Sequence, residues 1–421
     1  MEFDYVIAGG GSAGCVLAAR LSEDPTVTVC LIEADGTGCD LPSRAPPLVA
    51  AMISGRPKID NRAFRTVPQP GLNGRRSTTL GGSSSINAIL YLRGQPADYD
   101  GWADQGAEGW DWASCLPCFL RAENNARGAS GLHATGGPLG VTDQNAPRAI
   151  SMAFLDACET LHIRPNPDFN GPAQEGAGLY QVTQFHDGPH KGERCSAATA
   201  YLHPVMGRPN LTVLPRRLAE RVAIVDGRAR GVILRKGGVR QPITARREVI
   251  LSAGTFGSPK ILMLSGIGPA DALRAHGIAV THELPGVGQN LQDHLGYTIG
   301  HASTRPDLPG LGPAGPLRLA RAGLARWRNG EGLFTSPMAE SGAFLKSDPA
   351  LRRPDLQLHF VIGGVDDHPR KQPVRDGFSC HVCVLRPHSR GSVGLESAHP
   401  AQPPRIDPGY LSDPRDLPVL M

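Results

Sequence analysis

Charged residues are scarce in this chain of 421 residues: Asp, Glu, Lys and Arg together make up 19%, and lysine occurs six times. The 43 basic and 39 acidic residues leave a net charge of +4, and the arginines are spread along the chain. A nucleic-acid-binding protein ordinarily concentrates its basic residues on one surface, so this composition argues against a polyanionic partner. Hydrophobic residues reach 40%, which excludes general disorder. A length of 421 residues is too great for one ordinary core and predicts two or more domains, or one large α/β domain with insertions.

Long apolar runs are also missing. No uncharged stretch of 18 apolar residues occurs. The first expected strand begins at Phe3, and the basic and apolar regions typical of a signal peptide are not seen before it. We therefore expect no transmembrane segment and a cytoplasmic location, with peripheral contact at the inner membrane as the alternative.

Nine cysteines, an odd number, favour reduced thiols over a disulfide framework. Two C-x-x-C pairs, Cys115/Cys118 and Cys380/Cys383, have a spacing that zinc sites use. However, residues 378–385 are expected to form a strand, on which positions i and i+3 point to opposite faces. The first pair lies in an amphipathic stretch. We predict core cysteines at all four positions and no metal site.

The N-terminal 33 residues follow a β–α–β pattern. Residues 3–8 are typical of a buried strand, residues 9–14 form a glycine-rich turn, residues 15–22 favour a helix and residues 27–33 predict a second strand. Residues 35–75 are rich in proline and glycine and predict an extended excursion. Further along we expect a short helix pair within 102–124, a loop-rich region over 125–195 with a strand near 178–183, strands at 211–214, 221–225, 230–234 and 248–252, a helix at 258–264, a helix near 317–327, and strands near 355–361, 378–385 and 391–396.

The turn reads Gly9-Gly-Gly11-Ser-Ala-Gly14 and fits the G-x-G-x-x-G pattern of dinucleotide-binding sites. Gly9 allows the tight turn, Gly11 lets the backbone approach a pyrophosphate and Gly14 allows close packing of helix on strand, while Ser12 and Ala13 begin the helix whose N-terminus faces the phosphates. Glu33 closes the second strand and is placed to bind a ribose hydroxyl.

Two alternatives bear on this turn. Residues 10–14 also spell G-x-S-x-G, the nucleophile motif of serine hydrolases with Ser12 as the nucleophile, but no earlier strands exist to supply an oxyanion loop. The motif alone does not separate FAD from NAD. The excursion after Glu33 favours FAD, whose longer body needs contacts beyond the first β–α–β unit.

With these residues placed, the chain resembles the glucose-methanol-choline family of FAD-dependent oxidoreductases, most closely its bacterial alcohol dehydrogenase and choline dehydrogenase branch. The resemblance runs essentially from Phe3 to the last residue. It is carried by four segments, residues 4–18, residues 80–87 with Arg93-Gly94, residues 254–268 and residues 284–294.

The resemblance implies roles for particular residues. Gly81, Gly82 and Ser83 would bring backbone against the flavin diphosphate, and Asn87 would lie beside the isoalloxazine ring. Val222 matches the position whose backbone meets the adenine. Some relatives attach FAD through a histidine just before this asparagine, but Ile86 stands here, so we predict non-covalent FAD.

Glu340 matches an acidic residue near the substrate cavity in this branch, and an ordinary solvated glutamate is the alternative. The link between residues 75 and 80 is shorter than in relatives, which is expected to weaken the flavin cradle. The chain stops at Met421, soon after Ile406–Asp413, which resembles the family segment that precedes the active-site histidine and its histidine or asparagine partner. We therefore assign no catalytic residue; His294, His359, His381 and His388 match no catalytic motif and are interpreted as structural or surface histidines.

The family chemistry is oxidation of a primary alcohol to an aldehyde, with the proton passing to a neutral histidine and the hydride to flavin N5. We expect this activity to be impaired in the present chain; the alternatives are a non-catalytic flavin-binding remnant and, remotely, the serine hydrolase. The partners implied are a small alcohol and an electron acceptor such as a quinone. The fold predicted is mixed α/β, with a discontinuous Rossmann-type FAD-binding domain (1–150 and 190–298) and a sheet-based substrate-binding domain (151–189 and 299–421).

Overall fold

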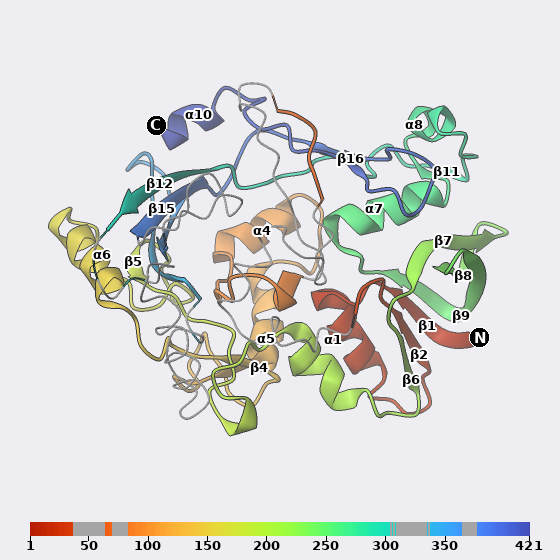
Figure 1. Cartoon of the computed structure of the whole chain (residues 1–421), viewed down its shortest axis with the longest axis horizontal. Helices are drawn as coiled ribbons and strands as arrows, with labels where there is room; N and C mark the ends of the chain where they lie inside the picture. Colours follow the sequence, from red (N-terminus) through yellow and green to blue (C-terminus); the bar gives the residue numbers. More distant parts are fainter. Residues whose placement is uncertain are drawn as a thin grey trace.

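The computed structural model describes residues 1–36, 64–69, 83–303, 305, 308, 335, 337–363 and 377–421. Two large β-sheets organise this part of the chain, one beside the N-terminus and one beside helix α6 (Figure 1). The mixed α/β class predicted from the sequence is confirmed.

The first sheet has six strands in the order β6-β2-β1-β9-β8-β7. Its parallel part consists of β6 (Leu211–Leu214), β2 (Val29–Ile32), β1 (Glu2–Ala8) and β9 (Val239–Leu251), and it continues antiparallel with β8 (Arg228–Lys236) and β7 (Leu218–Val225). Val6, Ile7 and Ala8 are completely buried. Such a continuous apolar run is expected where helices cover both faces of a parallel sheet.

Helix α1 (Ser12–Leu21) connects β1 to β2 and packs closely because its buried face carries small residues, among them Gly14 and Ala18. The π-helix η4 (Ala198–Leu202) joins the same core cluster. Helix α7 (Gly254–Leu264) follows β9, and its Ile261 packs with Ala8.

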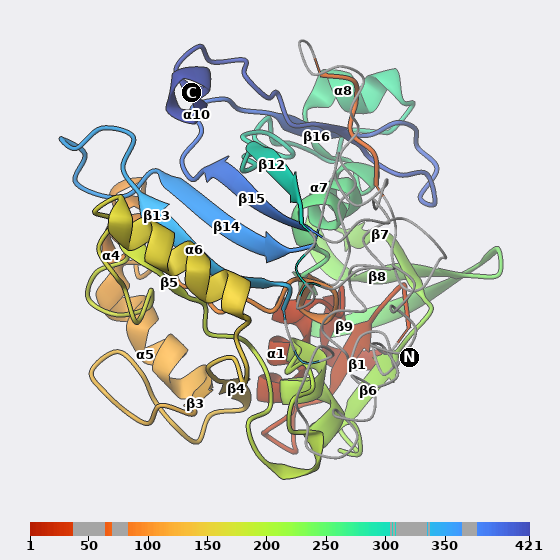
Figure 2. The ribbon, with the colours of Figure 1, turned by 60° about the vertical axis from the view of Figure 1, so that its left-hand side comes forward.

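The second sheet is antiparallel, with five strands in the order β12-β15-β14-β13-β5. These strands are β12 (Gly296–Ala302), β15 (Gly377–Val384), β14 (Leu356–Ile362), β13 (Ala339–Leu345) and β5 (Gly176–Leu179). Helix α6 (Ala149–Thr160) lies across one face of this sheet (Figure 2), where Phe154 stacks on Phe360 with ring centroids 4.7 Å apart. His359 and His381 pair on the opposite face, where Tyr180, directly after β5, lies against the His359 ring with centroids 5.8 Å apart.

Shorter elements complete the described structure. Helices α4 (Pro96–Asp104) and α5 (Trp112–Ala122) form a helix pair, but only α5 lies within the expected range 102–124, because α4 begins six residues earlier. The others are β3 (Glu123–Asn125), β4 (Leu139–Val141), β10 (Ile267–Gly268), α8 (Ala270–Ala275), β11 (His282–Glu283), β16 (Ser392–Gly394), β17 (Arg405–Asp407), α10 (Asp416–Leu420) and the single turns η2 (Ser83–Ser85), η3 (Gly188–His190) and η5 (His203–Val205).

Three sequence predictions need correction. The region 125–195 was expected to be loop-rich, but it contains helix α6. The second sheet includes β12 and β13, in two segments where the sequence predicted no strand. Cys115 and Cys118 are not core residues, since α5 leaves the first half-exposed and the second exposed. Cys383 is buried as predicted, whereas Cys380 is only partly buried. The helix expected near 317–327 lies outside the described residues.

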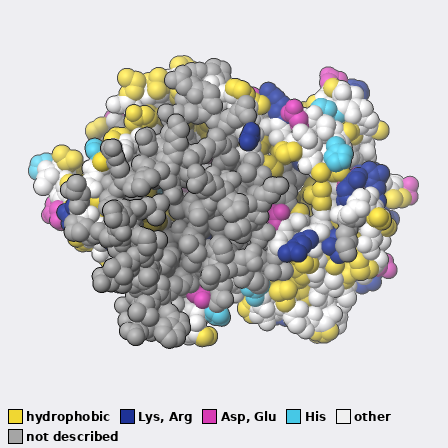
Figure 3. Space-filling view, viewed as in Figure 1, with side chains coloured by type: hydrophobic (Ala, Val, Ile, Leu, Met, Phe, Trp, Pro, Cys, Tyr) yellow, Lys and Arg dark blue, Asp and Glu magenta, His cyan; other side chains and the backbone are white. Residues whose placement is uncertain are grey.

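Several arginines on the first sheet are paired with carboxylates. Glu220 accepts hydrogen bonds from Arg235 and Arg240, and Asp4 accepts them from Arg246, whose guanidinium holds the pKa of Asp4 well below its usual range. On the face seen in Figure 3, dark blue groups lie on the right-hand part with acidic side chains between them. No helix in the described part of the chain is long and apolar enough to cross a membrane.

Candidate cofactor-binding site

The glycine turn between β1 and α1 is fixed by close backbone contacts. Gly9 has φ +111°, and a Cβ placed there would lie 2.5 Å from the carbonyl oxygen of Ser252. A Cβ on Gly14 would lie 1.9 Å from the carbonyl oxygen of Gly9, whereas one on Gly11 would meet nothing nearer than 3.9 Å. Gly9 and Gly14 are therefore required by packing, and Gly11 leaves space on the side of a ligand.

Glu33 directly follows β2 and holds this turn through its carboxylate. Its Oε2 accepts a hydrogen bond from the Gly10 N–H at 2.6 Å, and its Oε1 accepts one from the Asp35 N–H at 2.8 Å. The sequence predicted contact with a ribose hydroxyl. The structure shows a second role for Glu33, because its carboxylate already accepts a hydrogen bond from the backbone of the turn.

A cavity of about 630 Å³ opens at the carboxyl ends of β1, β2 and β9. This is within the range of about 300–1,000 Å³ found for small-molecule and cofactor sites. The sequence-predicted residues that the structure brings together on its wall are Gly9, Gly11, Ser12, Ala13, Glu33 and Ser83. Distant segments also contribute to the wall, among them Phe64, Thr66, Ser252, Lys260, Pro400 and Ile406.

Ser83 lines the cavity and begins a short turn, whereas Ile86 and Asn87 of that turn are not among the lining residues. The Asn87 N–H donates to the Ser83 carbonyl at 2.8 Å, and Asn87 itself is exposed. Ile86 is 2% exposed, so its side chain faces the protein interior. Gly81 and Gly82, predicted to cradle the diphosphate, lie outside the described residues.

Comparison with known proteins decides the family. The family model described as GMC oxidoreductase matches residues 3–296. An "Alcohol dehydrogenase [acceptor]" of Pseudomonas putida is 44% identical over 100% of this chain and 76% of its own length. The mitochondrial choline dehydrogenase of Mus musculus is 41% identical over 99% of this chain and 70% of its own length. This chain belongs to the GMC oxidoreductase family.

The fold agrees with that assignment. The crystal structure of pyridoxine 4-oxidase from Mesorbium loti superimposes with a TM-score of 0.86 at 30% identity, covering 99% of this chain and 79% of that one. GMC oxidoreductases are flavoproteins that bind FAD, and this chain is an FAD-dependent oxidoreductase.

The residues around the cavity offer hydrogen-bonding groups that suit FAD. The first turn of α1 has no side-chain cap, so its N–H groups face the cavity side as donors for a diphosphate. Thr66 lines the cavity and is buried, yet its hydroxyl oxygen has no hydrogen-bond partner within the described structure. Buried polar atoms are rarely left unmatched, so this hydroxyl is suited to a polar group of the cofactor.

Val222, expected beside the adenine, lies in β7 and is not among the cavity-lining residues. Its N–H donates to the Ser265 hydroxyl at 2.8 Å, and its side chain packs with Ala8. The nearby Leu218 and Ala219 do line the cavity. A contact between this strand and the adenine therefore remains a prediction, now centred a few residues earlier along β7.

Glu340, expected near the substrate, is 1% exposed, so it is not the solvated glutamate that we considered as the alternative. Its Oε2 accepts hydrogen bonds from the Arg148 N–H and from the Ser151 hydroxyl, both at 2.8 Å. These donors belong to the start of α6. The carboxylate therefore satisfies a helix N-terminus, a role that the sequence did not predict.

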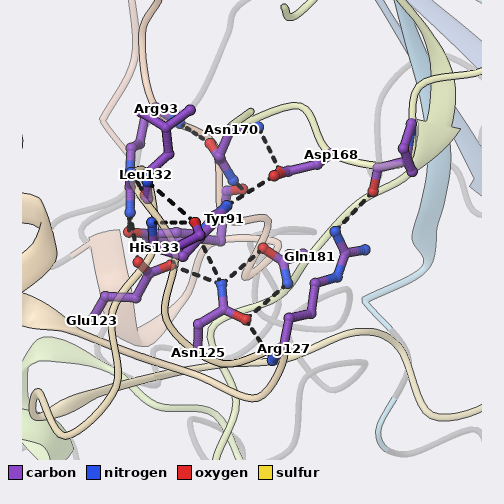
Figure 4. Close-up of polar contacts among 12 residues, drawn as sticks. Tyr91, Arg93, Glu123, Asn125, Arg127, Leu132, His133, Asp168, Asn170 and Gln181 are labelled. Atoms are coloured by element: carbon purple, nitrogen blue, oxygen red, sulfur yellow. Dashed lines mark hydrogen bonds and ion pairs between the residues drawn. The ribbon is translucent and has the colours of Figure 1, made fainter. Parts of the chain in front are cut away.

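A buried polar network near Arg93 was also missed (Figure 4). Glu123, with no exposed surface, accepts from Arg93 Nη2 at 2.7 Å and contacts His133 Nδ1 at 3.0 Å; His133 Nε2 contacts Asp168 at 2.8 Å. None of these residues lines the cavity. The network joins distant segments, because the Arg93 N–H also donates to Asn170, 77 positions further along the chain. No local pattern could have revealed it.

Two of the four histidines named from the sequence, His359 and His381, lie in the second sheet, and His294 and His388 lie outside its strands. His359 and His381 pair across β14 and β15, and His381 contacts the Ser379 hydroxyl at 3.0 Å and the Thr298 hydroxyl at 3.3 Å. Burial lowers the pKa of His359 to about 4, with His381 and His294 contributing. Among the described residues, no three His, Cys, Asp or Glu side chains gather into a metal-binding group.

Proposed function

We propose that this GMC oxidoreductase oxidises the CH–OH group of a small primary alcohol to the aldehyde. The observation that carries the proposal is the cavity at the glycine turn, whose wall joins backbone donors, Glu33 and Ser83 in a chain of this family. The Pseudomonas putida relative is named as an alcohol dehydrogenase that passes electrons to an acceptor. When bound, FAD supplies the acceptor for the hydride that leaves the alcohol carbon.

The residues of this chain hold and orient the cofactor. The α1 N-terminus and Gly11 would hold the diphosphate, Glu33 would hold a ribose, and Ser83 with Asn87 would hold the flavin end. Thr66 supplies a buried hydroxyl. The close contacts at Gly9 and Gly14 keep this frame rigid, so little ordering is needed when the cofactor binds.

Finer features belong to the same proposal. We propose a quinone as the electron acceptor and peripheral contact with a membrane; the Pseudomonas putida relative is named for an acceptor, and its name leaves the chemistry of that acceptor open. The two-domain division at 1–150 with 190–298, and 151–189 with 299–421, is kept as a hypothesis. Pro400 and Ile406 line the cavity of the first sheet, so this division assigns part of the cofactor site to the second domain.

The test is anaerobic mixing of the purified flavoprotein with a series of primary alcohols. We expect loss of the flavin absorbance near its visible maximum, and turnover when an artificial dye is added as acceptor. Dye-linked turnover would also measure the impairment expected from the sequence. A stoichiometric flavin that no alcohol bleaches would contradict the proposal and favour a non-catalytic flavin-binding protein.

Two simple measurements accompany it. Acid precipitation should release the yellow chromophore into the supernatant, because the buried Ile86 replaces the histidine to which some relatives attach FAD. A fluorophosphonate probe should leave Ser12 unlabelled, since no hydrogen bond between Ser12 and a histidine occurs among the described residues. Labelling of Ser12 in a colourless protein would instead support the hydrolase.

A further inference from the structure

The two polar atoms of the Asn87 side chain have different surroundings. Its Oδ1 accepts a hydrogen bond from the Ile89 N–H at 3.0 Å and another from Arg194 Nη1 at 2.7 Å. A backbone N–H and a guanidinium can only donate, so the atom that they share must be the amide oxygen. The orientation of the Asn87 amide is therefore fixed by chemistry.

Arg194 is the stronger of these two donors. It is 1% exposed, it lies 107 positions further along the chain, and its Nη1 also donates to the Ser84 carbonyl at 3.2 Å. Burial lowers the pKa of Arg194 to about 10, which leaves the guanidinium charged at neutral pH. A charge-assisted hydrogen bond of this length is stronger than one between neutral groups.

The amide nitrogen of Asn87, Nδ2, is on the other arm of the side-chain amide from this oxygen. Asn87 is exposed, and no hydrogen bond of its Nδ2 occurs among the described residues. Four positions earlier, Ser83 lines the cofactor cavity. The turn also holds Ile89 at φ 57°, although Ile89 is completely buried and β-branched. Such strain persists only where surrounding contacts enforce it, and it is concentrated at functional sites.

We propose that Arg194 is a positioning residue for flavin binding: it holds the Asn87 oxygen so that the Asn87 Nδ2 hydrogens are presented to the bound flavin as donors. Arg194 acts through Asn87 and through the Ser84 carbonyl, without itself touching substrate. The inference rests on FAD as the cofactor and is independent of which substrate the enzyme oxidises.

A double-mutant cycle on the full chain tests this. Apoprotein forms of the wild type, Asn87→Ala, Arg194→Gln and the double variant are titrated with FAD, and the quenching of flavin fluorescence gives each dissociation constant. We expect each single variant to bind FAD about tenfold more weakly, and the double variant to be no weaker than Asn87→Ala, because coupled residues do not act additively. An additive loss, about a hundredfold in the double variant, would overturn the proposal.

Two further variants separate positioning from general stability. Arg194→Lys keeps a buried donor and should recover part of the affinity, and it supplies the cycle if the glutamine variant does not fold. Arg208→Gln is the matched control: Arg208 Nη1 donates to the Ala19 carbonyl at 2.7 Å and to the Ser22 hydroxyl at 2.9 Å, at the far end of α1. FAD affinity should stay within about twofold of the wild type in that control, and an equal loss there would refute the specific role.

Asn87→Asp completes the set. An aspartate keeps the oxygen that Arg194 holds but has no N–H to present, so it should bind FAD as weakly as Asn87→Ala and shift the visible flavin spectrum similarly. Wild-type affinity in this variant would show that the amide donor is not used. These measurements of FAD binding need no alcohol, so they test the role of Arg194 even if the protein oxidises no alcohol. An additive result in the double-mutant cycle would likewise leave the proposed reaction unaffected.

Discussion

The two large sheets differ in which groups form the surface at each: backbone at the first sheet and side chains at the second. At the carboxyl edge of β1, β2 and β9, backbone geometry makes the cofactor site: the turn at Gly9 and Gly14 allows contacts that any side chain would prevent. On the second sheet, side chains from distant strands meet instead, as His359 and His381 do across β14 and β15. A backbone site depends on a few positions where a side chain cannot be tolerated, whereas a side-chain surface depends on long-range pairing.

The largest expected effect breaks the backbone site. In Gly14→Ala the new Cβ would lie 1.9 Å from the Gly9 carbonyl oxygen, so β1 and α1 must move apart. We expect destabilisation beyond the roughly 1–3 kcal/mol typical of overpacked cores, and loss of bound FAD. Thermal unfolding of the apoprotein and the ratio of flavin to protein measure the two effects.

Gly11→Ala is the matched control, because a Cβ there meets nothing nearer than 3.9 Å. We expect this variant to unfold at the wild-type temperature while binding FAD more weakly, since the methyl group faces the ligand side. If Gly11→Ala lost as much stability as Gly14→Ala, Gly11 would be required for packing as well, and the separate roles of the two glycines would be wrong.

An intermediate effect is expected on the second sheet at Glu340. Glu340→Ala removes the acceptor for the Arg148 N–H and the Ser151 hydroxyl, and unmatched buried donors cost about 1–3 kcal/mol each. Glu340→Gln keeps an acceptor oxygen and should lose less. Denaturant unfolding checks the order of the two variants; a changed KM for alcohol at unchanged stability would instead indicate a substrate contact.

The same residue explains what the sequence could and could not predict. The glycine turn, Glu33 and the parallel strands follow from short patterns, because the contacts that need glycine arise within one β–α–β unit. Helix α6 begins without a side-chain cap of its own, and its first turn is satisfied by Glu340, 192 positions from Arg148. Strand β13 contains Gly342 and has little intrinsic strand preference, so its pairing with β5 and β14 forms it.

The smallest effect concerns His359. Its pKa is about 4 in the folded protein, against an ordinary value of 6.5, because burial disfavours the charged ring and His381 and His294 face it. The unfolded chain therefore binds the proton first, so this contribution to stability is complete above pH 6.5 and is lost as the pH falls towards 4. The slope is at most about 1.4 kcal/mol per pH unit.

Unfolding measured from pH 7 to 4.5 in the wild type and in His359→Gln checks this. The variant should lose less stability over that range, and parallel curves would contradict the assignment. Gly11→Ala, altered only in the first sheet, should follow the wild-type curve.

The cavity wall includes Gly9, Gly11, Ser12 and Ala13 from the glycine turn, and Pro400, Ile406 and Pro408 from segments far along the chain. Lys260 Nζ donates to the Pro400 and Gln402 carbonyls, and Thr66 pairs with Ile406 in an isolated bridge. A ribosome adds these segments long after the glycine turn. The two sides of the pocket are therefore made at well-separated times, and once FAD is bound, the ligand connects the early-made turn to segments that are made much later.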